Sequence, residues 1–542
     1  MLGLMQEFPL IIPRLLSHAQ RVNGGTEIVS RRLEGDIHRY TFADMAVRAR
    51  RLANVLSRLG VEPGQVVGTM AWNGYRHMEL YYALPGTQSL YHTINPRLSA
   101  EQLAYVINHA EDQYIFVEAM FVPLLEKVAD KISRVKGFII LCDDGDMPDT
   151  ILPNAMCYES LLSVEDDSYQ WQDFDENTAA GICYTSGTTG NPKGVVYSHR
   201  ALVLQAMSSA IGLEVSARDS ILPIVPMFHV NGWTLPFMAA LLGTKLVLPG
   251  KNLDGASIYD LLHQEKVTFS AGVPTVWQML FDYLEQSGNK LPYLKKACIG
   301  GSAAPRSMLE TFRDKYEVEP QHAWGMTETT SMGSSPAIGA AVFARGKEAV
   351  MDARMTQGRA TFGAELKIVD EEGNEMPWDG KSSGALLIRG WAVSSAYLKG
   401  ESNKEFLEGG WFDTGDIAQV NDEGYLQLTD RAKDMIKSGG EWISSIDLEN
   451  AAAGHPDVAA AAVIGIYHPK WEERPLLVVV LRPGAELDRQ GILDHLEGRV
   501  AKWWLPDDIV TVAELPLGAT GKVQKNVLRD QFSDYSLPGV DK

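Results

Sequence analysis

The first 180 residues alternate between helix-like and strand-like segments. Residues 41–59 carry apolar side chains at helical spacing and end at Gly60, after which residues 66–70 have the composition of a strand. The same order recurs in a capped helix that begins at Ser99 and a strand at 113–117. Because this alternation is typical of parallel sheets covered by helices, it predicts an α/β fold for a large N-terminal domain.

Two later regions have a different pattern. Short β-like segments separated by turns predict a β-rich subdomain at about 358–430. Beyond residue 440 the chain is long enough for one small α+β domain, with a buried strand at 476–481. Residues 143–175 are acidic and irregular, and we expect them to form a loop region.

Composition argues against several classes of function. The formal net charge is −20 and no basic run is interleaved with aromatic residues, so we expect no nucleic-acid partner. The four cysteines have no paired spacing, which excludes CxxC motifs and fits a reducing, cytoplasmic location. The N-terminus lacks the pattern of a signal peptide. Residues 221–244 carry no Asp, Glu, Lys or Arg, but their three prolines favour a buried strand, turn and helix over stable membrane insertion.

The stretch from Tyr184 to Gly194 has the composition of a phosphate-binding loop. It contains three glycines, four Ser or Thr hydroxyls, one lysine and no acid. Glycines allow the backbone to approach an oxyanion closely, while N–H groups, hydroxyls and the lysine bind it. The stretch is not a GxxxxGK[ST] loop, because Lys193 follows Pro192 and Gly194 occupies the position of the magnesium-binding Ser or Thr.

This loop resembles the signature of the AMP-forming adenylating enzymes, the superfamily of acyl-CoA synthetases, peptide-synthetase adenylation domains and luciferases. Further motifs similar to that superfamily's follow in the expected order at 226–233, 301–305, 322–328, 410–416, 430–431 and 516–523. The resemblance implies that the protein binds ATP, Mg²⁺ and CoA. The phosphate-loop residues that it implies are Thr185, Ser186, Gly187, Thr188, Thr189, Gly190 and Lys193, and the metal-binding residues are Thr185 and Glu328.

The resemblance also implies where the nucleotide and the acyl group bind. The adenine, ribose and α-phosphate residues are Gly301, Ser302, Ala303, Ala304, Pro305, His322, Ala323, Trp324, Gly325, Met326, Thr327, Asp416 and Arg431. The acyl-site residues are His229, Val230, Asn231, Trp233, Gly301, Trp324, Gly325 and Met326. Many members of the superfamily have Tyr at the position of Trp324, so the tryptophan offers a larger stacking face and narrows the acyl pocket.

The implied reaction has two halves. A carboxylate first attacks the α-phosphate of ATP, and the thiol of CoA then attacks the acyl-adenylate. The implied catalytic residues are Lys522, Thr327, Glu328 and His229. Lys433 and Asp434 match the hinge, which divides the chain into an adenylation domain at 1–433 and a mobile domain at 434–542. The segment that matches the thiol channel contains Lys437, Gly439, Gly440, Glu441 and Trp442.

Several alternatives remain open at this stage. The residue sequences of the motifs resemble those of the branch that holds medium-chain acyl-CoA synthetases and 3-methylmercaptopropionate–CoA ligases. This resemblance implies 3-methylmercaptopropionate or another short or medium-chain acid as substrate. A medium-chain fatty-acid or aryl acid ligase is the nearest alternative. A peptide-synthetase adenylation domain, a luciferase-like oxygenase and a non-catalytic nucleotide-binding module are more distant ones. The resemblance also implies a homodimer.

Overall fold

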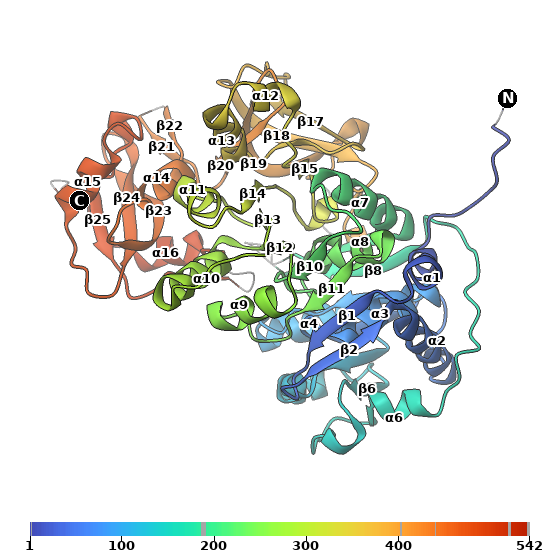
Figure 1. Ribbon diagram of the computed structural model, residues 1–542. Helices are drawn as coiled ribbons and strands as arrows, with labels where there is room; N and C mark the ends of the chain where they lie inside the picture. The colour runs from blue at the N-terminus through green and yellow to red at the C-terminus, as the bar shows by residue number, and fades with distance from the viewer. Residues whose placement is uncertain (2, 186–190, 401–403, 440, 519–521, 539–542) are drawn as a thin grey trace.

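The computed structural model describes residues 1, 3–185, 191–400, 404–439, 441–518 and 522–538. Within these residues the strands form two seven-stranded sheets, a four-stranded sheet, a two-stranded sheet and a five-stranded sheet near the C-terminus. Figure 1 shows the seven-stranded sheets in blue and green, the four-stranded sheet in yellow and orange, and the C-terminal sheet in red. The expected α/β class with a separate C-terminal α+β part is confirmed.

The first seven-stranded sheet ends in the hairpin that carries the glycine-rich loop. Its strands in spatial order are β7 (Ala155–Cys157), β6 (Gly137–Ile140), β5 (Tyr114–Val117), β3 (Val66–Met70), β4 (Leu90–Thr93), β8 (Ala179–Tyr184) and β9 (Gly194–Ser198). Neighbouring strands are parallel except β8 and β9, which are antiparallel with Tyr184 opposite Gly194. Residues 185–193 therefore connect two antiparallel strands at one edge of the sheet.

The second seven-stranded sheet aligns several of the predicted site segments. Its strands in spatial order are β14 (Glu319–His322), β13 (Lys296–Ile299), β12 (Phe269–Gly272), β10 (Ser220–Pro223), β11 (Lys245–Leu248), β1 (Glu27–Arg31) and β2 (Ile37–Thr41). Neighbouring strands are parallel except β1 and β2. Residues 300–305 and 323–328 follow the C-terminal ends of the adjacent strands β13 and β14, which is where open α/β sheets bind ligands.

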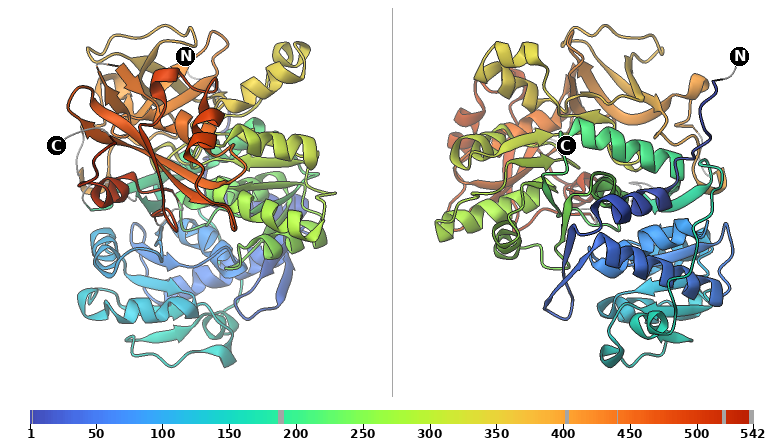
Figure 2. Two further views of the ribbon diagram at one scale, coloured as in Figure 1. Left: turned by 90° about the vertical axis from the view of Figure 1, so that its left-hand side faces the viewer. Right: turned by 45° about the vertical axis from the view of Figure 1, so that its right-hand side comes forward.

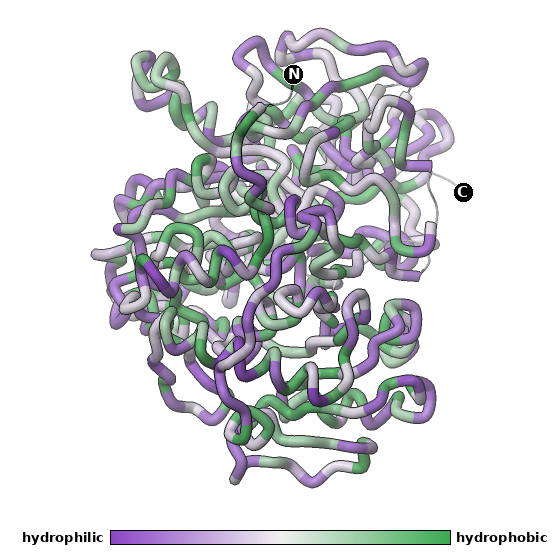
Figure 3. Tube along the Cα trace, turned by 90° about the vertical axis from the view of Figure 1, so that its right-hand side faces the viewer, coloured by the Kyte–Doolittle hydropathy of each residue, from purple (hydrophilic) through white to green (hydrophobic). Residues whose placement is uncertain are grey.

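Helices fill the space between the two large sheets and cover their outer faces (Figures 1 and 2). One hydrophobic core joins the inner faces of both sheets to α1 (Ile12–Asn23), α2 (Phe42–Arg58), α3 (Tyr75–Gly86), α7 (His199–Gly212) and α8 (Leu235–Leu242). The outer faces are covered by α4 (Ala100–Ala110), α5 (Val122–Glu126), α9 (Gly255–Gln264), α10 (Pro274–Ser287) and α11 (Arg306–Glu310). Figure 3 shows hydrophilic stretches along the outer loops.

An antiparallel region follows the second sheet. It contains α12 (Ala340–Ala344), α13 (Lys347–Met355), the paired strands β15 (Ser334–Ser335) and β16 (Arg359–Ala360), and a sheet of β17 (Ala364–Val369), β18 (Ser383–Gly390), β19 (Phe412–Val420) and β20 (Leu426–Arg431). Strand β19 alternates buried residues with less buried ones, and the sheet has one small core, as expected when one face is solvated. The expected β-rich character of this region is therefore present.

The C-terminal part builds a separate sheet with a core on each face. Its elements are β21 (Ile436–Ser438), β22 (Glu441–Ile443), α14 (Ser445–Ala452), β23 (Val458–His468), β24 (Glu472–Leu481), α15 (Arg489–Leu496), β25 (Asp508–Thr511) and α16 (Lys525–Gln531). Arg482 lies 3.9 Å from Asp282 of α10, so the two parts of the chain are in contact. The domain division at Lys433–Asp434 falls between β20 and β21 and stays a prediction.

One expectation about secondary structure was wrong. Residues 143–175 are not irregular throughout, since β7 adds a parallel strand to β6 and α6 (Tyr158–Ser163) follows it directly. The short β7 gains its backbone hydrogen bonds from a neighbouring strand, which local composition does not reveal. Residues 221–244 form β10, a turn and α8 as expected, and among the described residues no helix has the length and apolarity to cross a membrane.

A buried ion pair joins α2 to α3. Arg48 Nε lies 2.7 Å from Oε1 of Glu79, whose side chain is fully buried. Tyr158 donates a 2.6 Å hydrogen bond to the other carboxylate oxygen. Burial raises the pKa of Glu79, and Arg48 opposes that rise. The arginine therefore stabilises the ionised carboxylate inside the core.

We predict that Arg48→Met lowers the free energy of unfolding by about 3–5 kcal/mol, because it leaves the buried Glu79 carboxylate without its cation and also removes the pair with Glu159. The matched control is Arg58→Met on the same helix, where a half-exposed arginine pairs with Glu165 and contributes at most about 1 kcal/mol. Urea unfolding followed by circular dichroism measures both variants. Equal losses of stability in the two variants would mean that Glu79 is not ionised in the folded protein.

Candidate active site

The loop after β10 faces the loop after β13. A Cβ added to Gly300 would lie 3.0 Å from Cη2 of Trp233, and one added to Gly301 would lie 3.9 Å from its Cζ2. Gly301 also has a φ of 82°, a conformation that favours glycine. The Trp233 indole and the Gly300–Gly301 backbone, predicted from separate motifs, therefore form one wall.

An unusual turn presents His229 and Trp233. Residues 230–234 all have positive φ, between 38° and 60°, which is rare for residues other than glycine. The Asn231 side chain holds this turn to β4, because its Nδ2 donates to the Tyr91 hydroxyl at 3.0 Å and its Oδ1 accepts from the Thr93 hydroxyl at 3.2 Å. Strain of this kind persists where surrounding contacts fix the backbone, and it is typical of functional sites.

His229 is neutral at physiological pH. Burial lowers its pKa to about 3, and the nearby positive charges of Lys522 and Arg97 act in the same direction. A neutral imidazole offers a hydrogen bond to a ligand without adding charge. Val230, next to it, is buried.

The segment after β14 turns sharply back on itself. A Cβ at Gly325 would lie 1.5 Å from the Ser331 carbonyl oxygen, so only glycine fits there. The Met326 N–H donates to the Thr329 hydroxyl at 3.0 Å, and the Thr327 carbonyl accepts from the Tyr197 hydroxyl at 2.8 Å. These contacts fix the backbone that carries the predicted residues Thr327 and Glu328.

Glu328 is a buried carboxylate with one neutral partner. Its side chain accepts a 2.8 Å hydrogen bond from Tyr397, and the residue is 6% exposed. Burial raises the pKa of Glu328, whereas Tyr397, Arg431 and Lys193 lower it. Neither cation forms an ion pair with Glu328.

Asp416 is a second buried carboxylate among the predicted site residues. Arg431 Nε lies 2.8 Å from its Oδ1, and the Trp324 indole N–H donates to its Oδ2 at 3.0 Å. Burial raises the pKa of Asp416, while Arg431, Trp324 and Lys522 lower it. The two motifs assigned to adenine and ribose thus meet through a direct hydrogen bond.

Lys522 comes from the C-terminal part, and its ammonium group is influenced by the charges of both carboxylates. The residue is exposed as a whole, but its ammonium group lies near Arg431, Asp416 and Glu328, where burial lowers its pKa to about 8. Arg431 lowers this pKa further, and the two carboxylates oppose the shift. A lysine more than 300 residues beyond the glycine-rich loop in sequence therefore belongs to the same site.

Lys193 is held by side chains of a distant loop. Its Nζ lies 2.8 Å from Glu405 and 4.5 Å from the centre of the Tyr397 ring, and Tyr397 in turn bonds Glu328. The Thr185 N–H donates to the Lys193 carbonyl at 2.9 Å, which extends the β8–β9 pairing into the loop. The predicted residues Ser186, Gly187, Thr188, Thr189, Gly190 and Gly440 lie outside the described residues.

The remaining nucleotide residues lie on one rim of the second sheet. Burial lowers the pKa of His322 to about 4, and the Ala323 N–H continues the pairing of β14 with β13. Ala304 is buried in the core and Ser302 is exposed, while Ala303 and Pro305 are intermediate. These positions supply backbone and small side chains and no ion pair.

Lys437 and Gly439, two described residues of the predicted thiol-channel segment, contact their own sheet. Lys437 Nζ lies 3.4 Å from Glu472, and the Gly439 N–H donates to the Trp471 carbonyl at 2.8 Å. Glu441 lies in β22, and Trp442 is 46% exposed. The hinge residue Lys433 is exposed, whereas Asp434 is 9% exposed and pairs with Arg529 at 2.8 Å.

Sequence reasoning missed Tyr397, Glu405 and Arg97. Tyr397 bonds Glu328, Glu405 pairs with Lys193, and Arg97 affects the charge state of His229. No local pattern distinguishes these residues from ordinary surface positions, because their partners are distant in the sequence.

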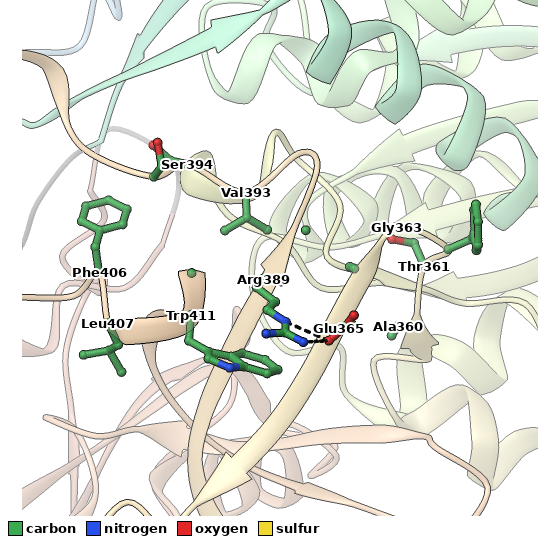
Figure 4. A pocket seen from close by; sticks show the side chains of 15 residues that line it. Ala360, Thr361, Gly363, Glu365, Arg389, Val393, Ser394, Phe406, Leu407 and Trp411 are labelled. Carbon is green, nitrogen blue, oxygen red and sulfur yellow. Dashed lines mark hydrogen bonds and ion pairs between the residues drawn. The ribbon is translucent and has the colours of Figure 1, made fainter. Parts of the chain in front are cut away.

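A separate cavity of about 920 Å³ lies in the antiparallel region. Figure 4 shows Arg389 paired with Glu365 beside Trp411 in this cavity. None of the lining residues belongs to the predicted site. Ser394, which lines the cavity, donates its backbone N–H to the Glu328 carbonyl at 2.8 Å. The cavity therefore adjoins the backbone that carries the buried carboxylate of Glu328.

Family comparison fits this arrangement. Residues 16–398 match the model of the AMP-binding enzyme family, and residues 447–522 match the model of the AMP-binding enzyme C-terminal domain. The chain belongs to the AMP-binding enzyme family.

Relatives of this AMP-binding enzyme span its full length. It is 46% identical over 536 residues to a 3-methylmercaptopropionyl-CoA ligase from Ruegeria lacuscaerulensis, covering 98% of this chain and 99% of the relative. It is 44% identical over 539 residues to a medium-chain-fatty-acid–CoA ligase from Ectopseudomonas oleovorans, covering 99% and 98%. Its fold is similar to that of an anthranilate CoA ligase in complex with anthranoyl-AMP, with a TM-score of 0.87, 23% identity and coverage of 97% and 98%. The expected family membership is confirmed, and the individual residue roles stay predictions.

The residues of this AMP-binding enzyme fit a magnesium ion. Glu328 is a buried carboxylate whose pKa burial raises, and its hydrogen-bond partner Tyr397 is neutral. A hard cation among phosphates would supply the missing positive charge, and carboxylate oxygen is the ligand that Mg²⁺ prefers. Thr185, at the end of β8, offers a hydroxyl as the second predicted ligand.

We predict that adenylate formation loses activity as the pH rises through about 8, because the Lys522 ammonium has a pKa of about 8 and is present only below that pH. The measurement is kcat/KM for ATP against pH, followed by pyrophosphate release. Lys522→Arg stays charged at higher pH, so its basic limb moves upward although its maximal rate is lower. A basic limb at the same pH in both proteins would assign the titration to another group.

Proposed function

We propose that this AMP-binding enzyme is an ATP-dependent acid–CoA ligase whose acid is 3-methylmercaptopropionate or a similar short or medium-chain acid. The single observation that carries the proposal is the position of Lys522. Its ammonium group lies near the buried carboxylates of Glu328 and Asp416 although it belongs to the C-terminal part. A mobile cation beside two nucleotide-binding carboxylates is the arrangement that adenylate formation requires.

In the first half-reaction a carboxylate oxygen of the acid attacks the α-phosphorus of ATP. The bond from this phosphorus to the bridging oxygen breaks, and pyrophosphate leaves. Lys522 and Thr327 stabilise the charge that develops on the α-phosphate, while neutral His229 orients the acid by a hydrogen bond. Glu328 and Thr185 would hold Mg²⁺, which supplies positive charge to the phosphates. The glycine-rich loop and Lys193 bind the β- and γ-phosphates, which leave as pyrophosphate.

In the second half-reaction the CoA thiol attacks the acyl carbonyl, a carbon–sulfur bond forms, and AMP leaves with the carboxyl oxygen. Lys522 then has to withdraw so that the segment at 437–442 lines the thiol path, which requires a rotation about Asp434. The contacts that would break are specific. Asp430 Oδ2 accepts from the Ser445 N–H at 2.7 Å and from its hydroxyl at 2.6 Å, across the proposed boundary.

The predicted acyl-site residues are compatible with a short acid. The Trp233 indole packs against the Gly300–Gly301 backbone, and His229 stands at the other end of the same turn. A thioether makes favourable contacts with aromatic rings, so a sulfur-containing chain suits a wall formed by Trp233. The 46% identical relative named as a 3-methylmercaptopropionyl-CoA ligase supports the same acid.

The experiment that tests the proposal supplies ATP, CoA and a panel of acids, and follows AMP, pyrophosphate and thioester. We expect the highest kcat/KM with 3-methylmercaptopropionate, lower values with butyrate and octanoate, and the lowest with benzoate. A preference for octanoate or benzoate would favour the medium-chain or aryl alternative. Formation of ADP in place of AMP would refute the mechanism.

Two variants are expected to separate the half-reactions in opposite directions. Lys522→Ala removes the charge at the α-phosphate, so adenylation falls by at least about a hundredfold while thioester formation from supplied acyl-adenylate persists.

Asp434→Pro fixes the backbone and removes the N–H that donates to the Arg431 carbonyl, so thioester formation falls and adenylation persists. Asp434→Ala, which loses only the Arg529 pair, is the control. Equal loss of both steps in each folded variant would contradict the division of roles.

We also propose a cytoplasmic homodimer. The four free cysteines, three of them buried, are consistent with a reducing compartment.

Other activities of the superfamily are less well supported. A luciferase-like reaction would consume oxygen. A non-catalytic module would not need Lys522 near the buried carboxylates of Glu328 and Asp416.

A further inference from the structure

Trp324 makes a polar contact that stacking on adenine does not require. Its indole N–H donates a 3.0 Å hydrogen bond to Oδ2 of Asp416. Both residues are buried, at 6% and 3% exposure. The donor is the indole N–H, a group that can donate a hydrogen bond but cannot accept one.

The acceptor positions of Asp416 are evenly divided. A carboxylate has about four lone-pair positions, two on each oxygen. Arg431 Nε–H occupies one on Oδ1 at 2.8 Å, and Trp324 occupies one on Oδ2. One position remains on each oxygen, which matches the two hydroxyls of a ribose.

Packing holds the indole in this orientation. A Cβ added to Gly333 would lie 2.4 Å from Cζ3 of Trp324, so the benzo edge fills the space that this glycine leaves. The backbone N–H of Trp324 donates to the Ser334 hydroxyl at 3.0 Å, and the backbone carbonyl of Trp324 accepts from the Gly333 N–H at 2.9 Å. Because both the backbone of Trp324 and the far edge of its ring are held, the indole N–H keeps its direction toward Oδ2 of Asp416.

We propose that Trp324 is a positioning residue for ribose recognition, and that its indole N–H fixes the rotation of the Asp416 carboxylate so that one free acceptor on each oxygen faces the 2′- and 3′-hydroxyls. This inference rests on the proposed ribose role of Asp416. Loss of the donor leaves a buried acceptor unpaired and the carboxylate held by Arg431 alone. Burial already raises the pKa of Asp416, and the Trp324 contact opposes that rise.

The test compares ATP with 2′-deoxyATP in the wild type and in Trp324→Phe, which keeps an aromatic face and removes the donor. The measured quantity is the ratio of the two kcat/KM values. We expect the wild type to prefer ATP by about tenfold or more, because a hydrogen bond to a charged group is lost with the deoxynucleotide. We expect this preference to fall about three- to tenfold in Trp324→Phe.

The outcomes distinguish the inference from its premise. A wild type that does not discriminate between the nucleotides would refute the ribose role of Asp416. Discrimination that is unchanged in Trp324→Phe, with both nucleotides weakened equally, would overturn the inference and leave Trp324 a stacking or packing residue. Should Trp324→Phe not fold, a benzothienylalanine at position 324 preserves the shape of the indole without its N–H, and the same ratio decides.

Discussion

Two buried carboxylates, those of Glu328 and Asp416, impose the main physical constraint on the site. A charge removed from water is costly unless partners compensate it, and burial raises the pKa of both groups. The compensating groups come from four separate regions of the chain: Tyr397 bonds Glu328, Trp324 and Arg431 bond Asp416, and the Lys522 ammonium lies near both. The second seven-stranded sheet, the antiparallel region and the C-terminal part therefore meet where negative charge is concentrated.

Backbone geometry gives this cluster its shape. Gly325 cannot carry a side chain because the Ser331 carbonyl occupies the space, and the left-handed turn at 230–234 depends on the Asn231 amide to hold it. The turn at 230–234 is strained and is held by side-chain contacts, whereas Gly325 only permits a close backbone approach. Both features fix the backbone beside predicted site residues. The rigid wall formed by Trp233 and Gly300–Gly301 then sets the space for an acid, while Lys522 arrives from a part of the chain joined through Asp434.

Sequence patterns anticipated the elements better than the connections between them. The helix at 42–58 and the capped helix after Ser99 form as expected, and the glycine-rich loop joins two strands. The short β7 was missed because its stability comes from pairing with β6. Asn231, expected beside the acid, directs its amide to Tyr91 and Thr93, and whether it also contacts a substrate stays a prediction.

The sequence by itself determined the fold class, the order of the motifs and the types of residue that the chemistry needs, because periodicity, capping and glycine placement act over a few residues. Only the tertiary structure decided which residues meet. The Trp324–Asp416 hydrogen bond, the Lys193–Glu405 pair and the approach of Lys522 to Glu328 each join positions about 90 or more residues apart. Their energies depend on burial and direction, and no local pattern encodes either quantity.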